Sequence, residues 1–210
     1  MKKAALAKEK IFDAAVFLFN AKGYAETSIR DIASRAGANI ATISYYFNGK
    51  EGLLEYSFIT FFEPYLETLE EQVEKLEEKG AVQCLKDTIQ GLMEFQHTHF
   101  HLTRFVLREV SIERQIVREL MSTYLMKERY LLQKILRYGM EKGELRRVSP
   151  GMCIIQLRSL MTMPFLNSIY TSEVWNVHLQ DRFYFEKYKE QLYDWVDAFL
   201  VNKKSGSPNT

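Results

Sequence analysis

The segment from Gly23 to Leu54, which reads GYAETSIRDIASRAGANIATISYYFNGKEGLL, constrains the fold more than any other part of the chain. The apolar residues of its first half recur at i, i+3 and i+4, which is the spacing of one side of a helix. Thr27 or Ser28 can cap the start of this helix, because a hydroxyl accepts a hydrogen bond from a free backbone N–H of the first turn. Gly37 can end it, since glycine most easily takes the positive φ of a helix terminus. The pattern therefore predicts a short helix followed by a tight turn.

A second short helix is predicted from about residue 39 to residue 47, with Asn39 as its cap. Ile40, Ile43 and Phe47 are spaced i, i+3 and i+7 and are expected to face a small core. The side chains left to face outward are Ala41, Thr42, Ser44, Tyr45 and Tyr46. Tyrosine hydroxyls suit phosphate oxygens, and the rings can pack on sugar or on a thymine methyl. The pattern indicates a helix presented to the major groove of DNA; the simpler alternative is a helical hairpin with a partly buried tyrosine pair.

Charge is distributed unevenly along the chain, although the net charge is only +1. Residues 1–50 contain eight lysines and arginines against four acids, whereas residues 51–80 contain nine glutamates against two lysines. Attraction for phosphate should therefore be confined to the N-terminal part of the protein. Lys50, at the start of the next predicted helix, is expected to contact a phosphate.

About the first 55 residues resemble the DNA-binding domain of TetR/AcrR-type regulators, through the phrases FNAKGY, TSIRDIA, AGANIATISYYF and GKEGLL. The resemblance implies an all-α fold, in which a three-helix helix-turn-helix domain precedes a helical domain for dimerisation and regulation. It also implies a role as a sequence-specific DNA-binding regulator. By position, it assigns the DNA contacts to Ser28, Arg30, Ala41, Thr42, Tyr45, Tyr46 and Lys50. Ser44 stands where the family often has an aromatic residue, which leaves the details of base reading open.

Three parts are expected along the chain: the helix-turn-helix domain at residues 1–50, the regulatory and dimerisation domain at 51–202, and a polar, disordered tail at 203–210. Helical periodicity dominates, and no strand pattern competes with it. Helices are predicted at about 5–22, 39–47, 50–79, 82–98, 101–111, 113–142, 150–166 and 181–201. Pro64 is expected to bend the long helix that contains it, and Gly80 is expected to stop that helix.

A homodimer is expected, because a single helix-turn-helix module contacts too few bases for useful specificity. A twofold dimer reads two half-sites about 34–36 Å apart, which predicts double-stranded DNA with an inverted repeat as the target. The apolar stripes of the last two long helices predict the dimer interface at Ile154, Leu157, Met161, Phe165, Tyr188, Leu192, Trp195 and Phe199. The alternative is that these stripes pack only within one subunit. Residues 171–180, between the two helices, are too many for a tight turn and could wrap across the partner.

The resemblance also implies a signal, because many members of the family bind a small molecule in the C-terminal domain. Side chains that could line such a pocket are Phe58, Phe61, Phe62, Phe95, Phe100, Phe105, Met121, Tyr124 and Met126. Aromatic residues at helical spacing are more often part of an ordinary core. No buried charge or polar constellation can be recognised that would indicate a class of ligand, so a small-molecule ligand stays open.

Nothing in the sequence predicts an enzyme, a cofactor or a metal site, since it contains no Gly-rich phosphate loop and no nucleophile elbow. His97 and His101 have the i, i+4 spacing of metal ligands, but no third ligand is indicated and a helix break near His99 would separate them. Cys84 and Cys153 are expected to be reduced core thiols. There is no run of about 18 apolar residues and no signal peptide, so the expected location is cytoplasmic and nucleoid-associated, without a membrane partner.

A protein partner is the remaining possibility. Arg104, Arg108, Arg118 and Glu119 lie in a stretch of interleaved charges, which is either a solvated face of salt bridges or a docking surface. The phrases FQHTHFHLTRFVLREVSIE, IVRELMSTYLMKERY and LRSLMTMPFLNSIYTSEV resemble the RefZ-type branch of the family, from endospore-forming Bacilli. That resemblance implies a DNA-bound dimer that restrains the tubulin-like division protein FtsZ, with these four residues as candidates for partner binding. The alternative function is that of a transcriptional repressor released by a small ligand.

Overall fold

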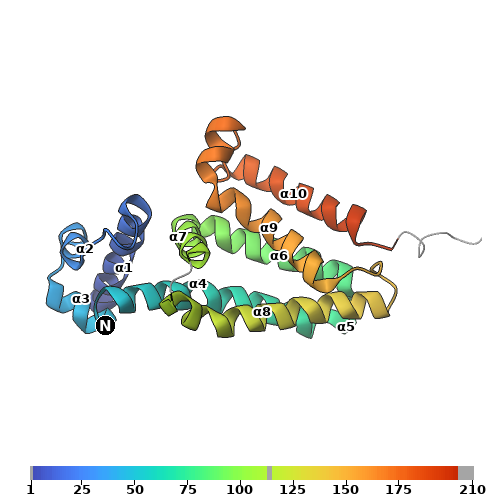
Figure 1. The fold of residues 1–210 in the computed structure, drawn as a ribbon, viewed down its shortest axis with the longest axis horizontal. Helices are drawn as coiled ribbons and strands as arrows, with labels where there is room; N and C mark the ends of the chain where they lie inside the picture. The colour runs from blue at the N-terminus through green and yellow to red at the C-terminus, as the bar shows by residue number, and fades with distance from the viewer. Residues whose placement is uncertain (1, 113–114, 203–210) are drawn as a thin grey trace, which may run out of the picture. The chain divides into compact units, whose positions relative to one another are not determined.

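The computed structural model describes residues 2–112 and 115–202, and its regular elements within those ranges are helices (Figure 1). They are α1 (Lys2–Lys22), α2 (Ile29–Ala36), α3 (Ile40–Phe47), α4 (Gly49–Glu74), α5 (Leu76–Lys79), α6 (Ala81–Thr98), α7 (Phe100–Ser111), α8 (Gln115–Glu141), α9 (Pro150–Leu166), the π-helix η1 (Tyr170–Val174) and α10 (Arg182–Phe199). The all-α prediction is confirmed. The predicted tail at 203–210 lies outside the described residues.

The chain divides into two compact units, which cut across the predicted boundary after residue 50. The N-terminal unit consists of Met1–Glu63 together with His101–Leu120, and the C-terminal unit consists of Pro64–Phe100 together with Met121–Thr210. The first half of α4 and nearly all of α7 therefore pack with the three N-terminal helices. The unit that carries the helix-turn-helix is larger than the sequence motif.

The core of the N-terminal unit is formed by apolar side chains from α1, α2, α3 and the start of α4. Those that are no more than 1% exposed are Ile11, Ala15, Phe19, Ile32, Ile43, Leu53, Leu54, Phe58, Phe61 and Phe62. The prediction that Ile43 and Phe47 face the core is confirmed, but the prediction for Ile40 is wrong, since its side chain is 41% exposed. Ile40 is the first residue of α3, and a residue in the first turn lies before the helix meets the core.

The predicted helix 50–79 is two helices in the structure. The helix α4 runs from Gly49 through Pro64 to Glu74, and the four-residue α5 follows after Lys75. Gly80 ends α5 with a φ of 77°, as predicted, and its backbone N–H donates to the carbonyl of Leu76. The expected bend at Pro64 stays a prediction, because a proline inside a helix removes one hydrogen bond without fixing a bend angle.

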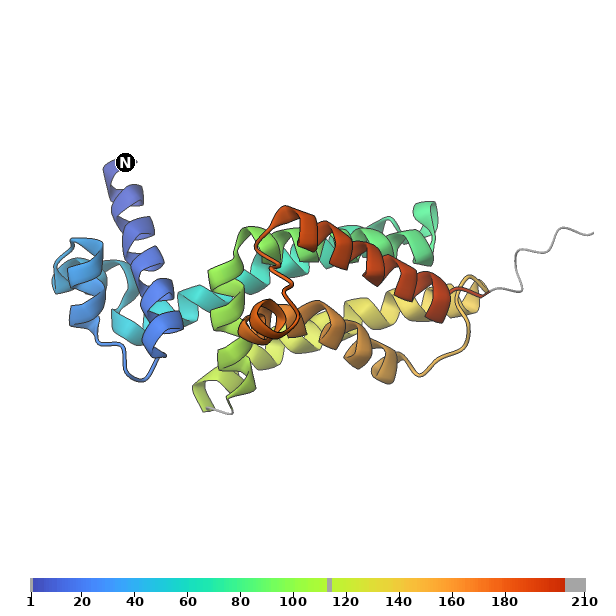
Figure 2. The ribbon, with the colours of Figure 1, turned by 90° about the horizontal axis from the view of Figure 1, so that it is seen from above.

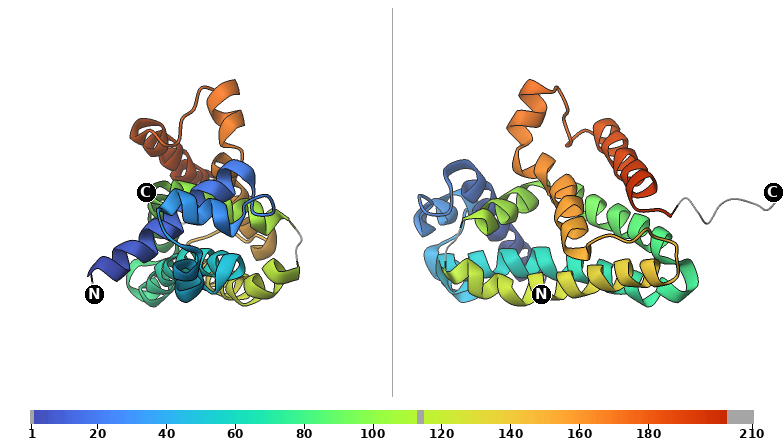
Figure 3. Two further views of the ribbon diagram at one scale, coloured as in Figure 1. Left: turned by 90° about the vertical axis from the view of Figure 1, so that its left-hand side faces the viewer. Right: turned by 45° about the vertical axis from the view of Figure 1, so that its right-hand side comes forward.

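The C-terminal unit is held by an apolar cluster from α5, α6, α8, α9, the loop before α9 and the C-cap of α10. Its buried members are Leu76, Ala81, Cys84, Leu85, Ile135, Leu136, Leu145, Cys153 and Leu200. Both cysteines are free and buried, which agrees with the predicted core thiols, and burial raises the pKa of Cys153 to about 11. The helices α6 and α10 lie along each other (Figure 2). The loop between α9 and α10 folds into η1 at its tip (Figure 3).

The histidine stretch contains the predicted break. The helix α6 ends at Thr98 with His99 as its C-cap, so His97 and His101 belong to different helices and different units. The Nε2 atom of His97 lies 3.3 Å from the carbonyl of Gln180, and its ring packs 4.3 Å from the ring of Phe185. Within 2–112 and 115–202, no helix is both long enough and apolar enough to span a membrane.

Candidate DNA interface

The start of α2 is fixed by a capping box. The Oγ atom of Ser28 accepts a hydrogen bond from the backbone N–H of Asp31 at 3.1 Å, and the Asp31 carboxylate accepts from the backbone N–H of Ser28 at 3.0 Å. The hydrogen bonds from the backbone and hydroxyl of Ser28 lower the pKa of Asp31. Of the two predicted caps, Ser28 is therefore the correct one. Thr27 is buried instead, and its hydroxyl donates to the carbonyl of Gly23 at 2.7 Å.

The turn between α2 and α3 follows the sequence prediction. Gly37 has a φ of 62°, and its backbone N–H donates back to α2. Asn39 then caps α3, because its Oδ1 atom accepts from both the backbone N–H and the hydroxyl of Thr42, at 2.7 and 2.8 Å. Asn48 ends α3 in the left-handed conformation with a φ of 55°. Local hydrogen bonds thus fix both ends of an eight-residue helix that would be unstable alone.

The outer face of α3 carries the predicted reading residues. Ala41, Ser44 and Tyr45 are exposed, while Thr42 and Tyr46 are half-buried. Tyr45 is 83% exposed, which is unusual for a large aromatic side chain. The rings of Tyr45 and Tyr46 meet edge to face with centroids 5.1 Å apart, so the two side chains form one small platform.

Two further predicted contacts lie at the start of α2. Ser28 is exposed, although its hydroxyl is engaged with Asp31. Arg30, two residues later, is exposed in the first turn of α2. The start of a helix carries a partial positive charge, so this position suits a phosphate.

Lys50 lies at the start of α4, as predicted, and contacts the loop before α2. Its ammonium donates hydrogen bonds to the main-chain carbonyls of Tyr24, Ala25 and Thr27, at 2.9, 3.3 and 2.9 Å. The same ammonium lies 4.5 Å from the centre of the Tyr24 ring. The loop between α1 and α2 leaves these carbonyls without helical partners, and Lys50 satisfies them. Its direct contact with a phosphate stays a prediction, while its contact with the loop is observed.

Arg108 and Arg104 are half-buried in the N-terminal unit. Arg108, on α7, donates to the main-chain carbonyls of Phe19 and Asn20 near the end of α1. Arg104 is half-buried, and loss of hydration together with the neighbouring Arg108 charge lowers its pKa. The partner-binding role of these two arginines stays a prediction, while the contact of Arg108 with the end of α1 is observed.

The other two partner candidates remain on the surface. Arg118 and Glu119 are exposed in the first two turns of α8. Glu119 accepts a hydrogen bond from the side-chain amide of Gln115 at 3.0 Å. Their role in partner binding stays a prediction.

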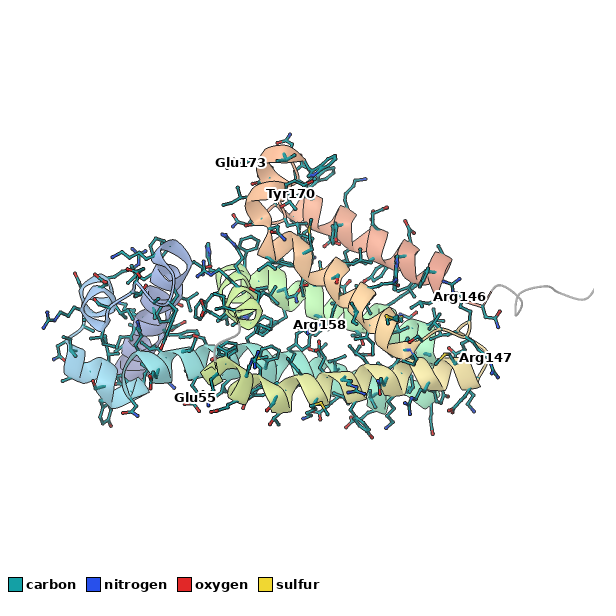
Figure 4. The ribbon with its side chains drawn as sticks, viewed as in Figure 1. Glu55, Arg146, Arg147, Arg158, Tyr170 and Glu173 are labelled. Carbon is teal, nitrogen blue, oxygen red and sulfur yellow. The ribbon has the colours of Figure 1, made fainter. Side chains whose placement is uncertain are left out.

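A cleft of about 780 Å³ adjoins the reading face, between α3 and the first turns of α4. Tyr46 and Tyr56 line it together with Glu51 and Glu55, and Glu55 is marked in Figure 4. The two carboxylates repel phosphate, so they set one edge of the surface that DNA can approach.

The predicted dimer residues fall into two groups in the C-terminal unit. Leu157, Met161, Phe165 and Leu192 are no more than 3% exposed within a single protomer, so they are core residues and cannot form the interface. The other four predicted residues are half-buried: Ile154, Tyr188, Trp195 and Phe199. The apolar stripe predicted on α9 is the face that packs within its own subunit.

The opposite face of α9 is apolar and exposed. Met152, Ile155 and Met163 are 67%, 62% and 40% exposed. Beside them lies an apolar groove of about 680 Å³ between α9 and α10, which Tyr188, Trp195 and Phe199 help to line. An exposed, contiguous apolar face of this kind is typical of an interaction surface.

A buried polar cluster, which sequence reasoning missed, joins α4, α8 and α9 in the C-terminal unit. The hydroxyl of Tyr65 donates to the Oε1 atom of Glu128 at 2.6 Å, and the Nε atom of Arg158 lies 3.1 Å from that oxygen. Burial, followed by the Glu128 charge, raises the pKa of Tyr65 well above its ordinary value. Arg158 is marked in Figure 4. These residues are 63 and 30 positions apart, so no local pattern could have revealed the cluster.

Comparison with known proteins agrees with this geometry. A family model described as bacterial regulatory proteins of the tetR family matches residues 11–56. The chain is 41% identical over 189 residues to the probable HTH-type transcriptional regulator YttP of Bacillus subtilis, covering 90% of this chain and 91% of the relative. It is 30% identical over 139 residues to the fatty acid metabolism regulator protein of the same organism, covering 65% and 70%.

Among solved structures, a putative fatty acid metabolism regulator of Clostridium perfringens superimposes with a TM-score of 0.74 at 18% identity, covering 96% of this chain and all of that chain. The chain belongs to the tetR family of bacterial regulatory proteins, and it is a TetR-type transcriptional regulator.

Proposed function

We propose that the protein acts as a homodimer that reads an inverted repeat in double-stranded DNA through α3. The observation that carries the proposal is the outward face of α3, where an almost fully exposed Tyr45 sits on a helix locked at both ends. Tyr45, Tyr46, Ala41 and Thr42 face the bases, and Arg30 contacts the backbone. The half-sites of such a target are about one helical turn apart.

The dimer forms through the exposed face of α9 and the adjoining groove. Met152, Ile155 and Met163 supply apolar surface, while the half-buried Trp195 and Phe199 supply the wall of the groove. Burying such surface is the main driving force for stable association. These residues replace the buried ones in the sequence-based prediction.

The experiment is sedimentation of the protein with duplexes recovered from its own genome by affinity selection. The proposal expects two protomers on each duplex, and binding that is lost in the Tyr45→Ala, Tyr46→Ala double variant. Tyr130→Ala is the matched control, because Tyr130 is a 63% exposed tyrosine in the C-terminal unit. One protomer on each duplex, or equal loss in the control, contradicts the proposal.

A second candidate function is release from DNA by a small ligand, which the buried polar cluster favours. Arg158 is the cation of that cluster, and an acidic group on a ligand could replace Glu128 as its partner. Tyr65 lies on α4, which also contributes Leu53 and Leu54 to the core of the N-terminal unit. A ligand that favours one arrangement of α4 would therefore shift DNA affinity.

The names of two relatives suggest fatty carboxylates as the first ligands to try. The candidate function expects a long-chain fatty acid or its coenzyme A ester to raise the melting temperature and weaken DNA binding. The double variant Glu128→Gln, Arg158→Met should remove both effects and keep DNA binding. If none of these compounds changes the melting temperature or DNA affinity, this candidate is wrong for fatty ligands.

A cell-division role, with FtsZ as the partner, rests on the sequence resemblance alone. Of the four residues predicted to bind this partner, Arg118 and Glu119 are exposed. A map of the protein on its chromosome distinguishes the candidates. Sites in promoters favour the repressor, whereas sites at fixed chromosomal positions without changes in expression favour control of division. In the second case Arg118→Ala should spare DNA binding and weaken co-sedimentation with FtsZ.

A further inference from the structure

The loop between α9 and α10 exposes more large apolar side chains than its length explains. Ile169, Val174 and Trp175 are each 63% exposed, and Tyr170 is 46% exposed. Single exposed apolar residues are ordinary, but a cluster of them in seven residues marks a contact surface. Figure 4 marks Tyr170 and Glu173 on η1, at the tip of this loop. We refer to residues 169–175 as the arm.

The arm has a defined conformation. The backbone N–H of Thr171 donates to the carbonyl of Asn167 at 3.1 Å, and that of Val177 donates to the carbonyl of Thr171 at 2.8 Å. The chain then turns through Asn176, which has a φ of 53°. The rings of Tyr170 and Trp175 meet edge to face at 6.3 Å. An arm that is already ordered loses little entropy when it docks, so its apolar side chains are presented ready for contact.

The arm is continuous with the apolar groove of the same unit. Trp175 lines this groove together with Trp195 and Phe199, whose rings stack at 5.1 Å. Ile155 and Met163 line the same groove from α9. The exposed face of α9, the groove and the arm therefore form one apolar surface, and Glu173 is the one charged residue of the arm.

We propose that the arm is a clasp that packs on a second copy of this chain. In the dimer, Ile169, Val174 and Trp175 of each protomer bury against the partner beside the groove between its α9 and α10. This inference rests on the proposed dimer, and it adds a contact beyond the packing of α9 and α10. A second copy fits because a twofold contact brings the same continuous apolar surface to both sides. An unrelated protein or a small apolar molecule would cover only part of this surface.

The two tryptophans of the chain provide the test, since they are Trp175 and Trp195. Trp195→Phe leaves Trp175 as the one fluorescent indole. Its emission and its quenching by acrylamide are measured across a dilution series, and sedimentation on the same samples gives the oligomeric state. The clasp predicts that Trp175 emission moves to shorter wavelength and that quenching falls several-fold as the dimer forms.

The outcomes separate the clasp from the dimer itself. A dimer in which Trp175 stays water-exposed overturns the clasp and leaves the proposed function standing. If the unaltered chain is a monomer at all concentrations, both proposals are overturned. If sedimentation shows that the dimer dissociates on dilution and the short-wavelength emission does not change, Trp175 packs on its own protomer, which also overturns the clasp.

A second measurement uses the dimer dissociation constant of arm variants. Val174→Ser with Trp175→Ser should raise this constant at least tenfold, with an unchanged helical circular dichroism spectrum. Met126→Ser is the matched control, because Met126 is 61% exposed on α8 and outside the arm. Equal dissociation constants for the arm variant, the control and the unaltered chain overturn the proposal.

Discussion

Arg108 donates a hydrogen bond from its guanidinium to the main-chain carbonyl of Asn20, at 3.3 Å. It also donates to the carbonyl of Phe19, and the ring of Phe19 stacks on that of Phe105 at 4.9 Å. The helix α1 ends at Lys22, so these carbonyls belong to its last turn, where the carbonyl of Phe19 also accepts from the backbone N–H of Gly23 at 3.1 Å. A cation at this end also complements the helix dipole. The helix α7 thus holds the helix against which the reading module packs.

Arg108→Ala should lower the free energy of unfolding by about 1–3 kcal/mol, because its two charged hydrogen bonds to the carbonyls of Phe19 and Asn20 are lost. Affinity for the specific DNA site should fall, while the dependence of affinity on salt stays the same, since no phosphate contact is removed. Urea unfolding and a salt titration measure the two effects. Arg129→Ala, at an exposed arginine of α8, should change neither quantity. A flatter salt dependence in Arg108→Ala would show that Arg108 contacts DNA directly.

Lys50→Met separates two roles of one lysine. We expect a lower melting temperature, because the carbonyls of Tyr24, Ala25 and Thr27 lose their donor. The predicted phosphate contact adds a second effect, in which the slope of log affinity against log salt falls by about 0.9. An unchanged slope would show that the ammonium serves the loop alone.

The double variant Tyr45→Ala, Tyr46→Ala should bind its specific site about 10³-fold more weakly, which is the lower end of the usual gap between specific and non-specific affinity. The fold should be unaffected, because Tyr45 is 83% exposed and the core of α3 is supplied by Ile43 and Phe47. Fluorescence anisotropy with the specific duplex and a scrambled duplex measures the gap. Retained discrimination between the two duplexes would refute the assignment of α3 as the reading helix.

Glu128→Ala should destabilise the C-terminal unit by about 1–3 kcal/mol, because the half-buried Arg158 and the buried hydroxyl of Tyr65 lose their shared partner. Adding Arg158→Met should recover part of that loss, since the unpaired charge is then removed. Urea unfolding of the single and double variants tests this. A double variant that is less stable than Glu128→Ala would mean that Arg158 has other partners that matter more.

The ion pair between Glu94 and Arg182 predicts a dependence of stability on pH. Hydrogen bonds from Arg182, with its charge and that of Lys189, hold the pKa of Glu94 below its ordinary value of 4.5. The folded state therefore favours the ionised carboxylate. The stabilisation is present above the ordinary pKa and is lost as the pH falls through the lower folded pKa. The stability difference between the unaltered chain and Glu94→Gln, measured by urea unfolding, should shrink between about pH 6 and pH 3. A stability difference that stays constant over this pH range would contradict the prediction.

Much of the reading module could be predicted because its signals are local. Ser28, Gly37 and Asn39 specify caps and a turn within four residues of themselves, and the structure contains each of them. The positions of most helices followed from periodicity for the same reason. The start of α3 is the exception, since Ile40 matched the periodicity and yet lies before the helix reaches the core.

Long-range pairings could not be read from the sequence. Lys50 contacts carbonyls 23 to 26 residues away, and Arg108 contacts carbonyls 88 and 89 residues away. Both were interpreted as surface cations because a charge pattern does not reveal a main-chain acceptor. The dimer interface predicted from α9 was wrong for a different reason, because this helix is apolar on two faces. Periodicity identified the face of Leu157, and only packing shows that Ile155 is the exposed one.

The most direct test of the account is selection from a random duplex library by the unaltered protein, followed by sequencing of the bound DNA. A homodimer that reads DNA through α3 should select a twofold-symmetric motif whose half-site centres lie about 34–36 Å apart, and the Tyr45→Ala, Tyr46→Ala variant should enrich no motif. An asymmetric motif, or the same motif recovered by the double variant, would contradict the claim that a homodimer reads DNA through α3.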